Sequence, residues 1–206
     1  DLNEENLEAL KKGMPNLLQH LDNMANVFGI PTVVAINAFP TDTDAELELV
    51  KAMCEEKGAN VVLSEVWAKG ISLAKEVLEL VEKDSEDFEF IYDLRLSIKD
   101  KIKVIAKKIY RADDVVFDAK VSKTIKQLEE LGYGDLPICM AKTQFSFSDD
   151  PTLLGAPRNF NISVSDVKVN AGAGFIVVKT GNILTMPGLP KVPAAEHIDI
   201  DNDGKI

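Results

Sequence analysis

The feature that most constrains the fold is a short run of β-branched and apolar residues that stops abruptly in a polar loop. Residues 32–36 read TVVAI, and NAFPTDT follows at residues 37–43. Such a run between turn-forming residues is typical of a strand buried on both faces of a parallel sheet. The acidic residues that follow predict a helix at Ala45–Lys57. Phe39 then leaves the carboxyl end of a strand, where open α/β sheets bind their ligands.

A second junction between a strand and a loop repeats this arrangement. Asn60–Leu63 is expected to be a strand, and the loop SEVWAKG follows it and carries Trp67, the single tryptophan. One right-handed crossover would place Trp67 at the same edge of the sheet as Phe39. Two aromatic rings at neighbouring strand ends could clamp a flat heterocycle. The alternative is that both rings are buried in the core.

The rest of the chain alternates between helical and strand patterns. We expect helices at Asn3–Leu21 (with a break at Pro15), Ser72–Glu82, Leu94–Tyr110 and Lys120–Leu131, and strands at Val115–Phe117, Leu136–Ala141, Ile162–Val169, Gly174–Lys179 and Ile183–Met186. A turn-rich stretch near residue 144 predicts a joint between two units. The fold class is therefore α/β: a parallel-sheet βαβ domain at residues 23–144, followed by a smaller strand-rich C-terminal unit at residues 145–206.

Composition excludes several classes of function. The net charge of −11 argues against a surface for nucleic acid or for an anionic membrane. No apolar run approaches the roughly 18 residues that a membrane span needs, and no signal peptide is visible. The two cysteines, Cys54 and Cys139, form no disulfide framework, and we expect reduced core thiols in a cytoplasmic protein.

Few residues in the sequence suggest a phosphate-binding, catalytic or metal-binding role. No Gly-x-x-x-x-Gly-Lys-Ser/Thr loop is present, and His20 and His197 suggest no catalytic set. The acidic turn at residues 199–204 resembles only the start of a calcium loop, so no metal site is expected. The lysines of residues 99–108 are expected to form a solvated helix face.

One glycine-rich segment is a weaker candidate for a binding site. Gly172 and Gly174, in the sequence NAGAG, could let backbone amides approach a nucleotide, together with Pro187. The alternative is a tight turn between two strands.

Four blocks of sequence together resemble a known family. AINAFPTDTDAEL, SEVWAKG, LPICMAKTQFSFSDDPTLLGAP and NAGAGFIVVKTGNILTMPGLPKVPAAEHIDIDNDGKI closely resemble formate–tetrahydrofolate ligase, also called formyltetrahydrofolate synthetase. The resemblance runs from about Asn16 to Ile206. It implies the C-terminal portion of that enzyme, without the N-terminal ATP-binding domain, so that residues 1–22 would be a helix following that domain.

The resemblance implies a reaction and a site. Such enzymes join formate to tetrahydrofolate with ATP, through formyl phosphate, to give 10-formyltetrahydrofolate. Phe39 and Trp67 match the residues that stack on the two faces of the pterin ring, and Leu63 would lie beside it. ATP would be held mainly by the missing domain, so this chain alone would be inactive, and the intact enzyme would be a homo-oligomer. A stand-alone folate-binding or regulatory module is the alternative, and an unrelated α/β enzyme is a third reading.

Three departures from the family pattern stand out. Ala38 replaces a larger polar residue, several glycines that usually follow the WAKG motif are missing after Gly70, and Arg111 stands where the family favours glycine. The first two concern the shape of the folate pocket, and none involves Phe39 or Trp67.

Overall fold

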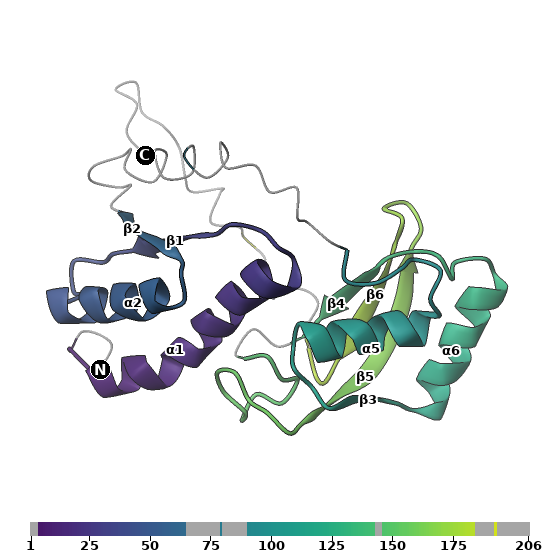
Figure 1. Cartoon of the computed structure of the whole chain (residues 1–206). Coiled ribbons are helices and arrows are strands. Elements are labelled where there is room, and N and C mark those ends of the chain that lie inside the picture. Colours follow the sequence, from purple (N-terminus) through teal and green to yellow (C-terminus); the bar gives the residue numbers. More distant parts are fainter. Residues whose placement is uncertain (1–3, 65–78, 80–89, 143–145, 184–191, 193–206) are drawn as a thin grey trace.

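The computed structural model describes residues 4–64, 79, 90–142, 146–183 and 192, and its elements form two halves (Figure 1). The first half contains α1 (Leu7–Asp22), the π-helix η1 (Asn23–Val27), β1 (Val33–Asn37), α2 (Asp44–Glu56) and β2 (Asn60–Ser64). The second contains α5 (Ile98–Lys108), β3 (Asp114–Phe117), α6 (Ala119–Glu130), β4 (Ile138–Ala141), β5 (Asn161–Asn170) and β6 (Phe175–Thr180). Among the described residues these are four α-helices, a parallel two-stranded sheet and a mixed four-stranded sheet, which confirms the α/β class.

The first half is the βαβ unit that the opening sequence run predicted. β1 and β2 pair in parallel, from Val33 opposite Asn60 to Asn37 opposite Ser64. α2 connects the two strands. An apolar cluster, built around the buried residues Met14, Leu21 and Cys54, covers the face of the sheet on which α2 lies. Parallel pairing requires such a crossover, because the chain must return to the starting edge of the sheet.

The predicted break at Pro15 in the first helix is wrong. α1 continues through Pro15 from Leu7 to Asp22, and Asn6 caps its start by accepting a hydrogen bond from the Ala9 N–H at 2.9 Å. Met14 and Leu21 are 3% and 6% exposed and belong to the same core cluster. Burying both side chains requires an uninterrupted helix, and this offsets the cost of about 3 kcal/mol that an interior proline imposes.

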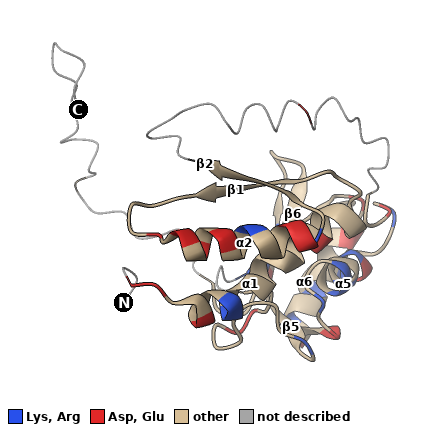
Figure 2. Ribbon diagram, turned by 60° about the vertical axis from the view of Figure 1, so that its left-hand side comes forward, with Lys and Arg blue, Asp and Glu red and all other residues tan. Residues whose placement is uncertain are grey.

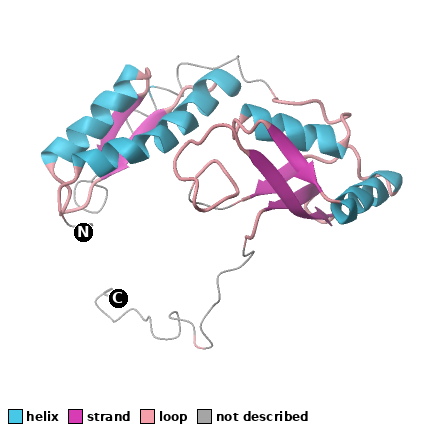
Figure 3. Cartoon of the chain, turned by 90° about the horizontal axis from the view of Figure 1, so that it is seen from below, coloured by secondary structure: helices cyan, strands magenta, loops and turns pink. Residues whose placement is uncertain are grey.

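The second half is a four-stranded sheet covered by α5 and α6. Its strand order is β3-β5-β6-β4; β3 pairs with β5 and β4 pairs with β6 in parallel, whereas β5 and β6 form an antiparallel hairpin. Figure 3 shows this sheet separated from the β1–β2 pair. Its core contains fully buried isoleucines from each layer, among them Ile98, Ile102, Ile162 and Ile176.

This sheet combines strands from both sides of the joint expected near residue 144. β3 and β4 were expected to belong to the same parallel domain as β1 and β2, but they pair with β5 and β6 instead. The expected boundary between residues 144 and 145 thus falls between two strands of one sheet. The domain limits drawn from the sequence stay a prediction.

The expected helix at Ser72–Glu82 lies outside the described residues except for Glu79, and the strand expected at Ile183–Met186 lies outside them except for Ile183.

Two side chains of the second half depart from the expected burial. Lys101 is fully buried, and its ammonium group donates to the carbonyl oxygens of Gly134 and Leu136 at 2.5 and 3.0 Å, so the lysines of α5 are not all solvated. Burial lowers the pKa of Lys101. Cys139 is exposed on β4, whereas Cys54 is buried as expected.

No helix in the described part of the chain is long and apolar enough to cross a bilayer.

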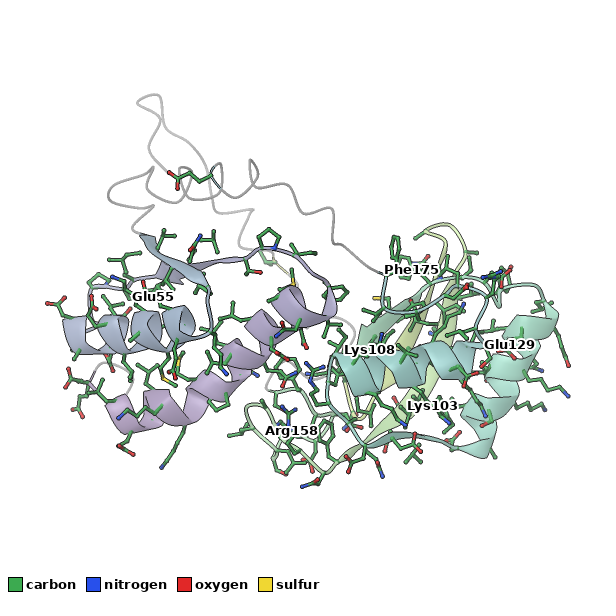
Figure 4. All side chains as sticks on the ribbon, viewed as in Figure 1. Glu55, Lys103, Lys108, Glu129, Arg158 and Phe175 are labelled. Carbon is green, nitrogen blue, oxygen red and sulfur yellow. The ribbon has the colours of Figure 1, made fainter. Side chains whose placement is uncertain are left out.

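The two halves meet through a polar junction at the end of α1 (Figure 4). The side-chain amides of Gln19 and Asn23 both donate to the Ile109 carbonyl oxygen, at 3.4 and 3.0 Å. Arg158 donates in turn to the Gln19 side-chain oxygen at 3.0 Å. Gln19 and Asn23 are only 5% and 4% exposed, so each lost partner would leave a buried polar group unsatisfied.

Arg111 adds an ion pair to this junction and explains one departure from the family pattern. Its φ of +59° lies in the left-handed region, where glycine is the least strained residue. The Arg111 guanidinium pairs with the Asp22 carboxylate. A hydrogen bond from Asn26 and the contact with Arg111 lower the pKa of Asp22. The ion pair gives Arg111 a function at a position that otherwise favours glycine.

We predict that Gln19→Leu lowers the free energy of unfolding by about 2 kcal/mol, because it removes two hydrogen bonds and leaves the Arg158 donor without its partner. Urea unfolding followed by circular dichroism measures the change. Gln127→Leu is the matched control, since Gln127 is an exposed glutamine on α6, and its effect should stay within about 0.5 kcal/mol. Equal effects of the two variants would contradict a stabilising role for the junction.

Candidate functional site

The candidate site is built on the parallel pairing of β1 and β2. Asn37 and Ser64 are the last residues of these strands and lie opposite each other in the register. Phe39 follows Asn37 by two residues, and Trp67 follows Ser64 by three. The loops that carry the two aromatic residues therefore leave the same edge of the sheet. Trp67 itself lies outside the described residues.

Phe39 is presented to solvent by a closed loop. Its backbone N–H donates to the Asp42 carboxylate at 2.8 Å, and the Asp42 N–H donates to the Phe39 carbonyl oxygen at 3.0 Å. This reciprocal pair fixes the loop as a turn. The Phe39 residue is nevertheless 62% exposed, so its ring is not a core residue in this structure. A large apolar ring that a fixed loop holds in solvent can bind a flat apolar partner.

The helix that follows anchors this loop. Thr43 caps α2 by accepting from the Glu46 N–H at 3.3 Å, and the Glu46 side chain accepts from the Thr43 N–H at 3.2 Å, which completes a capping box. The Asn6 N–H also donates to Glu46 at 3.0 Å, and the Thr43 hydroxyl donates to Glu5 at 2.6 Å. Hydrogen bonds from the backbone N–H groups of Asn6 and then Thr43 lower the pKa of Glu46. The loop is thus tied both to α2 and to the start of α1.

Leu63 lies at the same end of the sheet and lines a cavity. This cavity of about 420 Å³ lies between the strands and α2, and its walls include Ile36, Leu47 and Lys51 together with Leu63. Leu63 is 40% exposed and stands opposite Ile36 in the register. The charged positions of α2 are mostly acidic, as the red segments of its ribbon show (Figure 2). The structure therefore brings Leu63 and the Phe39 loop to one edge of the same sheet.

The glycine candidates lie elsewhere. Gly172 and Gly174 belong to the turn that joins β5 to β6, where the N–H groups of Ala173 and Gly174 donate to the Asn170 carbonyl oxygen at 3.1 and 2.9 Å. Gly174 has a φ of +73°, which accounts for a glycine at that position of the turn. In Figure 1 this hairpin lies in the half away from β1 and β2. The structure thus shows the tight turn, and a role for these glycines in nucleotide binding stays a prediction. Pro187 lies outside the described residues.

Lys142 and His20 belong to the junction between the halves. Lys142 directly follows β4. Its ammonium group donates to the Ser146 carbonyl oxygen and lies 5.7 Å from the centroid of the Tyr110 ring. The His20 ring packs against Phe147 with a centroid distance of 4.5 Å. Partial burial, and then the charge of Lys142, lower the pKa of His20. The His20 ring therefore packs α1 against the second half, and Lys142 contacts Ser146 and Tyr110 within that half.

A second cavity, of about 890 Å³, lies beside α5 and β4 and was not expected from the sequence. Its walls come from segments that are far apart in the chain, so no local pattern indicated it. In the described part of the chain, no group of three or more His, Cys, Asp or Glu residues could hold a metal ion.

Comparison with known families supplies the identity of the chain. Enzymes of the formate–tetrahydrofolate ligase family are ligases whose substrates are formate, tetrahydrofolate and ATP. The sequence model of this family matches residues 1–206, the entire chain. The chain therefore belongs to the formate–tetrahydrofolate ligase family.

Proposed function

We propose that this chain contributes the pterin-binding part of a formate–tetrahydrofolate ligase. Phe39 and Trp67 stack on opposite faces of the pteridine ring, and Leu63 packs at its side. The edge of the ring remains open for hydrogen bonds. The reaction of the whole enzyme joins formate to tetrahydrofolate with ATP and passes through formyl phosphate, which the amine of the bound folate attacks.

The observation that carries this proposal is the parallel register of β1 and β2. With Asn37 opposite Ser64, the Phe39 loop and the loop that carries Trp67 leave neighbouring strand ends. Phe39 is exposed on a turn held by two hydrogen bonds, so little conformational entropy is lost when it binds a ring. Stacking of two aromatic rings contributes about 0.5–1.5 kcal/mol beyond the burial of apolar area.

The cavity beside Leu63 supports the same location. Ile36, Leu47 and Leu63 offer apolar contact next to the strand ends. Lys51 lies on the same wall and carries a positive charge that could attract the anionic end of a folate. The Asp44 and Glu48 carboxylates also line this wall and reduce that attraction, so the ring is the main source of affinity.

The phosphate chemistry requires residues beyond those that we assign here. The sequence contains no glycine-rich loop of the Gly-x-x-x-x-Gly-Lys-Ser/Thr type that would cradle ATP phosphates. We therefore propose that ATP and formyl phosphate are held mainly by another part of the enzyme. Gly172, Gly174 and Pro187 are retained only as secondary candidates on the nucleotide side.

Phe39→Ala should weaken tetrahydrofolate binding by about thirtyfold, since it removes about 2 kcal/mol of stacking and apolar burial. Quenching of the fluorescence of Trp67, the single tryptophan, by tetrahydrofolate measures the affinity. Phe175→Ala is the matched control, because Phe175 begins β6 in the other half (Figure 4). If Phe39→Ala binds as tightly as the parent, or Phe175→Ala loses as much affinity, the assigned site is wrong.

The purified chain should produce no 10-formyltetrahydrofolate from ATP, formate and tetrahydrofolate. The expected result follows from the proposal that the phosphate-binding residues lie outside this chain. Absorbance of the cyclised product after acid treatment measures turnover, and a tetrahydrofolate titration of the same sample shows that the chain is folded. Turnover by the isolated chain would refute the proposal that another part of the enzyme holds ATP and formyl phosphate.

A further inference from the structure

The second cavity, lined mainly by the half that carries the four-stranded sheet, has the size and walls of a small-molecule site. Its volume of about 890 Å³ is within the range of sites that hold drug-sized ligands. Residues from four separate parts of the chain line it: Phe28, Tyr92, Ile105, Tyr110, Ile138 and Met140. Three of these side chains are aromatic, so a flat ring would find both stacking surfaces and apolar contact.

The wall formed by residues 90–94 is fixed by hydrogen bonds to the elements around it. The Tyr92 hydroxyl accepts from the Ile138 N–H at 3.0 Å, which ties the segment to the start of β4. Lys108, at the end of α5, donates to the Ile91 carbonyl oxygen at 3.2 Å (Figure 4). Arg95 holds the Asp93 carboxylate with contacts down to 2.5 Å. A wall held in this way is already formed before a ligand binds, which lowers the cost of binding.

Two phenol groups supply the polar contacts of the cavity. Within the described residues, no hydrogen bond of the Tyr110 hydroxyl is found, although Tyr110 is half-buried, lining the cavity and lying 6.4 Å from the Phe147 ring. Burial raises the pKa of Tyr110 to about 12, so the phenol is neutral and can donate. Because the Tyr92 hydroxyl uses a lone pair to accept from Ile138, it also keeps its proton for donation.

The charges around the cavity decide what kind of ligand fits. Among the described residues that line it there is no lysine or arginine, and the carboxylate of Asp93 at its wall is already paired with Arg95. A phosphate or carboxylate would enter without a countercharge, at a high desolvation cost. An uncharged ring with acceptor atoms on its edge would instead satisfy the two phenol donors.

We propose that this cavity binds an uncharged bicyclic heteroaromatic ring, which accepts a hydrogen bond from Tyr110 and stacks against the aromatic walls. A purine base and a pteridine share this chemistry. The cavity is separate from the Phe39 edge of the β1–β2 sheet, and it involves none of the residues proposed for the pterin clamp.

The test uses the full chain with two uncharged probes, adenosine and pterin, in saturation-transfer NMR titrations. We expect at least one probe to bind and to lose about fivefold in affinity in Tyr110→Phe, which removes one hydroxyl and one hydrogen bond. Tyr133→Phe is the matched control, because Tyr133 packs on the same core without lining the cavity. Binding of adenosine identifies a purine site, and binding of pterin identifies a pteridine site.

Phe39→Ala separates this site from the proposed clamp. Binding that depends on Tyr110 and is unchanged in Phe39→Ala supports the cavity site, even if the proposed pterin site at Phe39 is wrong. Binding that is unchanged in Tyr110→Phe, binding that is lost only in Phe39→Ala, or no binding of either probe would overturn the proposal.

Discussion

The parallel pairing of β1 and β2 is the constraint on which the candidate site depends. Parallel strands must be joined by a crossover, here α2. The carboxyl ends of β1 and β2 therefore lie at the same edge of the sheet. This geometry places Asn37, two residues before Phe39, opposite Ser64, three residues before Trp67, although 28 positions separate the two aromatic residues in the sequence. The capping box of α2 and the hydrogen bonds around Asp42 then hold the Phe39 loop in place. A pterin clamp needs both conditions: neighbouring strand ends and a loop that does not collapse onto the core.

A junction rich in hydrogen bonds, with the His20–Phe147 ring contact beside it, connects the first half to the second. Gln19 and Asn23 bind the Ile109 carbonyl oxygen, and Asp22 pairs with Arg111. Directional hydrogen bonds fix one orientation of the two halves more strictly than apolar contact would, because each buried amide accepts few geometries. Such a junction would keep the edge that carries Phe39 in a fixed orientation relative to the four-stranded half.

Local signals in the sequence predicted much of this structure. Strand runs with β-branched residues, the acidic residues at the start of α2 and helical periodicity indicated most of the helices and strands that the structure describes, and the βαβ pattern placed Phe39 at a strand end. What failed was non-local. Nothing in the sequence of β3 or β4 shows that they pair with β5 and β6. Likewise, no residue near Lys101 in the sequence indicates the two distant carbonyl groups that accept hydrogen bonds from its buried ammonium group. The junction and the aromatic cavity were missed for the same reason, since their residues come from distant segments.

We propose that the folate ring lies between two aromatic side chains at the edge of the β1–β2 sheet. A crystal structure of this chain with tetrahydrofolate tests this proposal most directly. We expect the pteridine ring between the side chains of Phe39 and Trp67, with Leu63 in contact at its side. A ring bound away from both side chains, or Phe39 and Trp67 too far apart to touch one ligand, would contradict it.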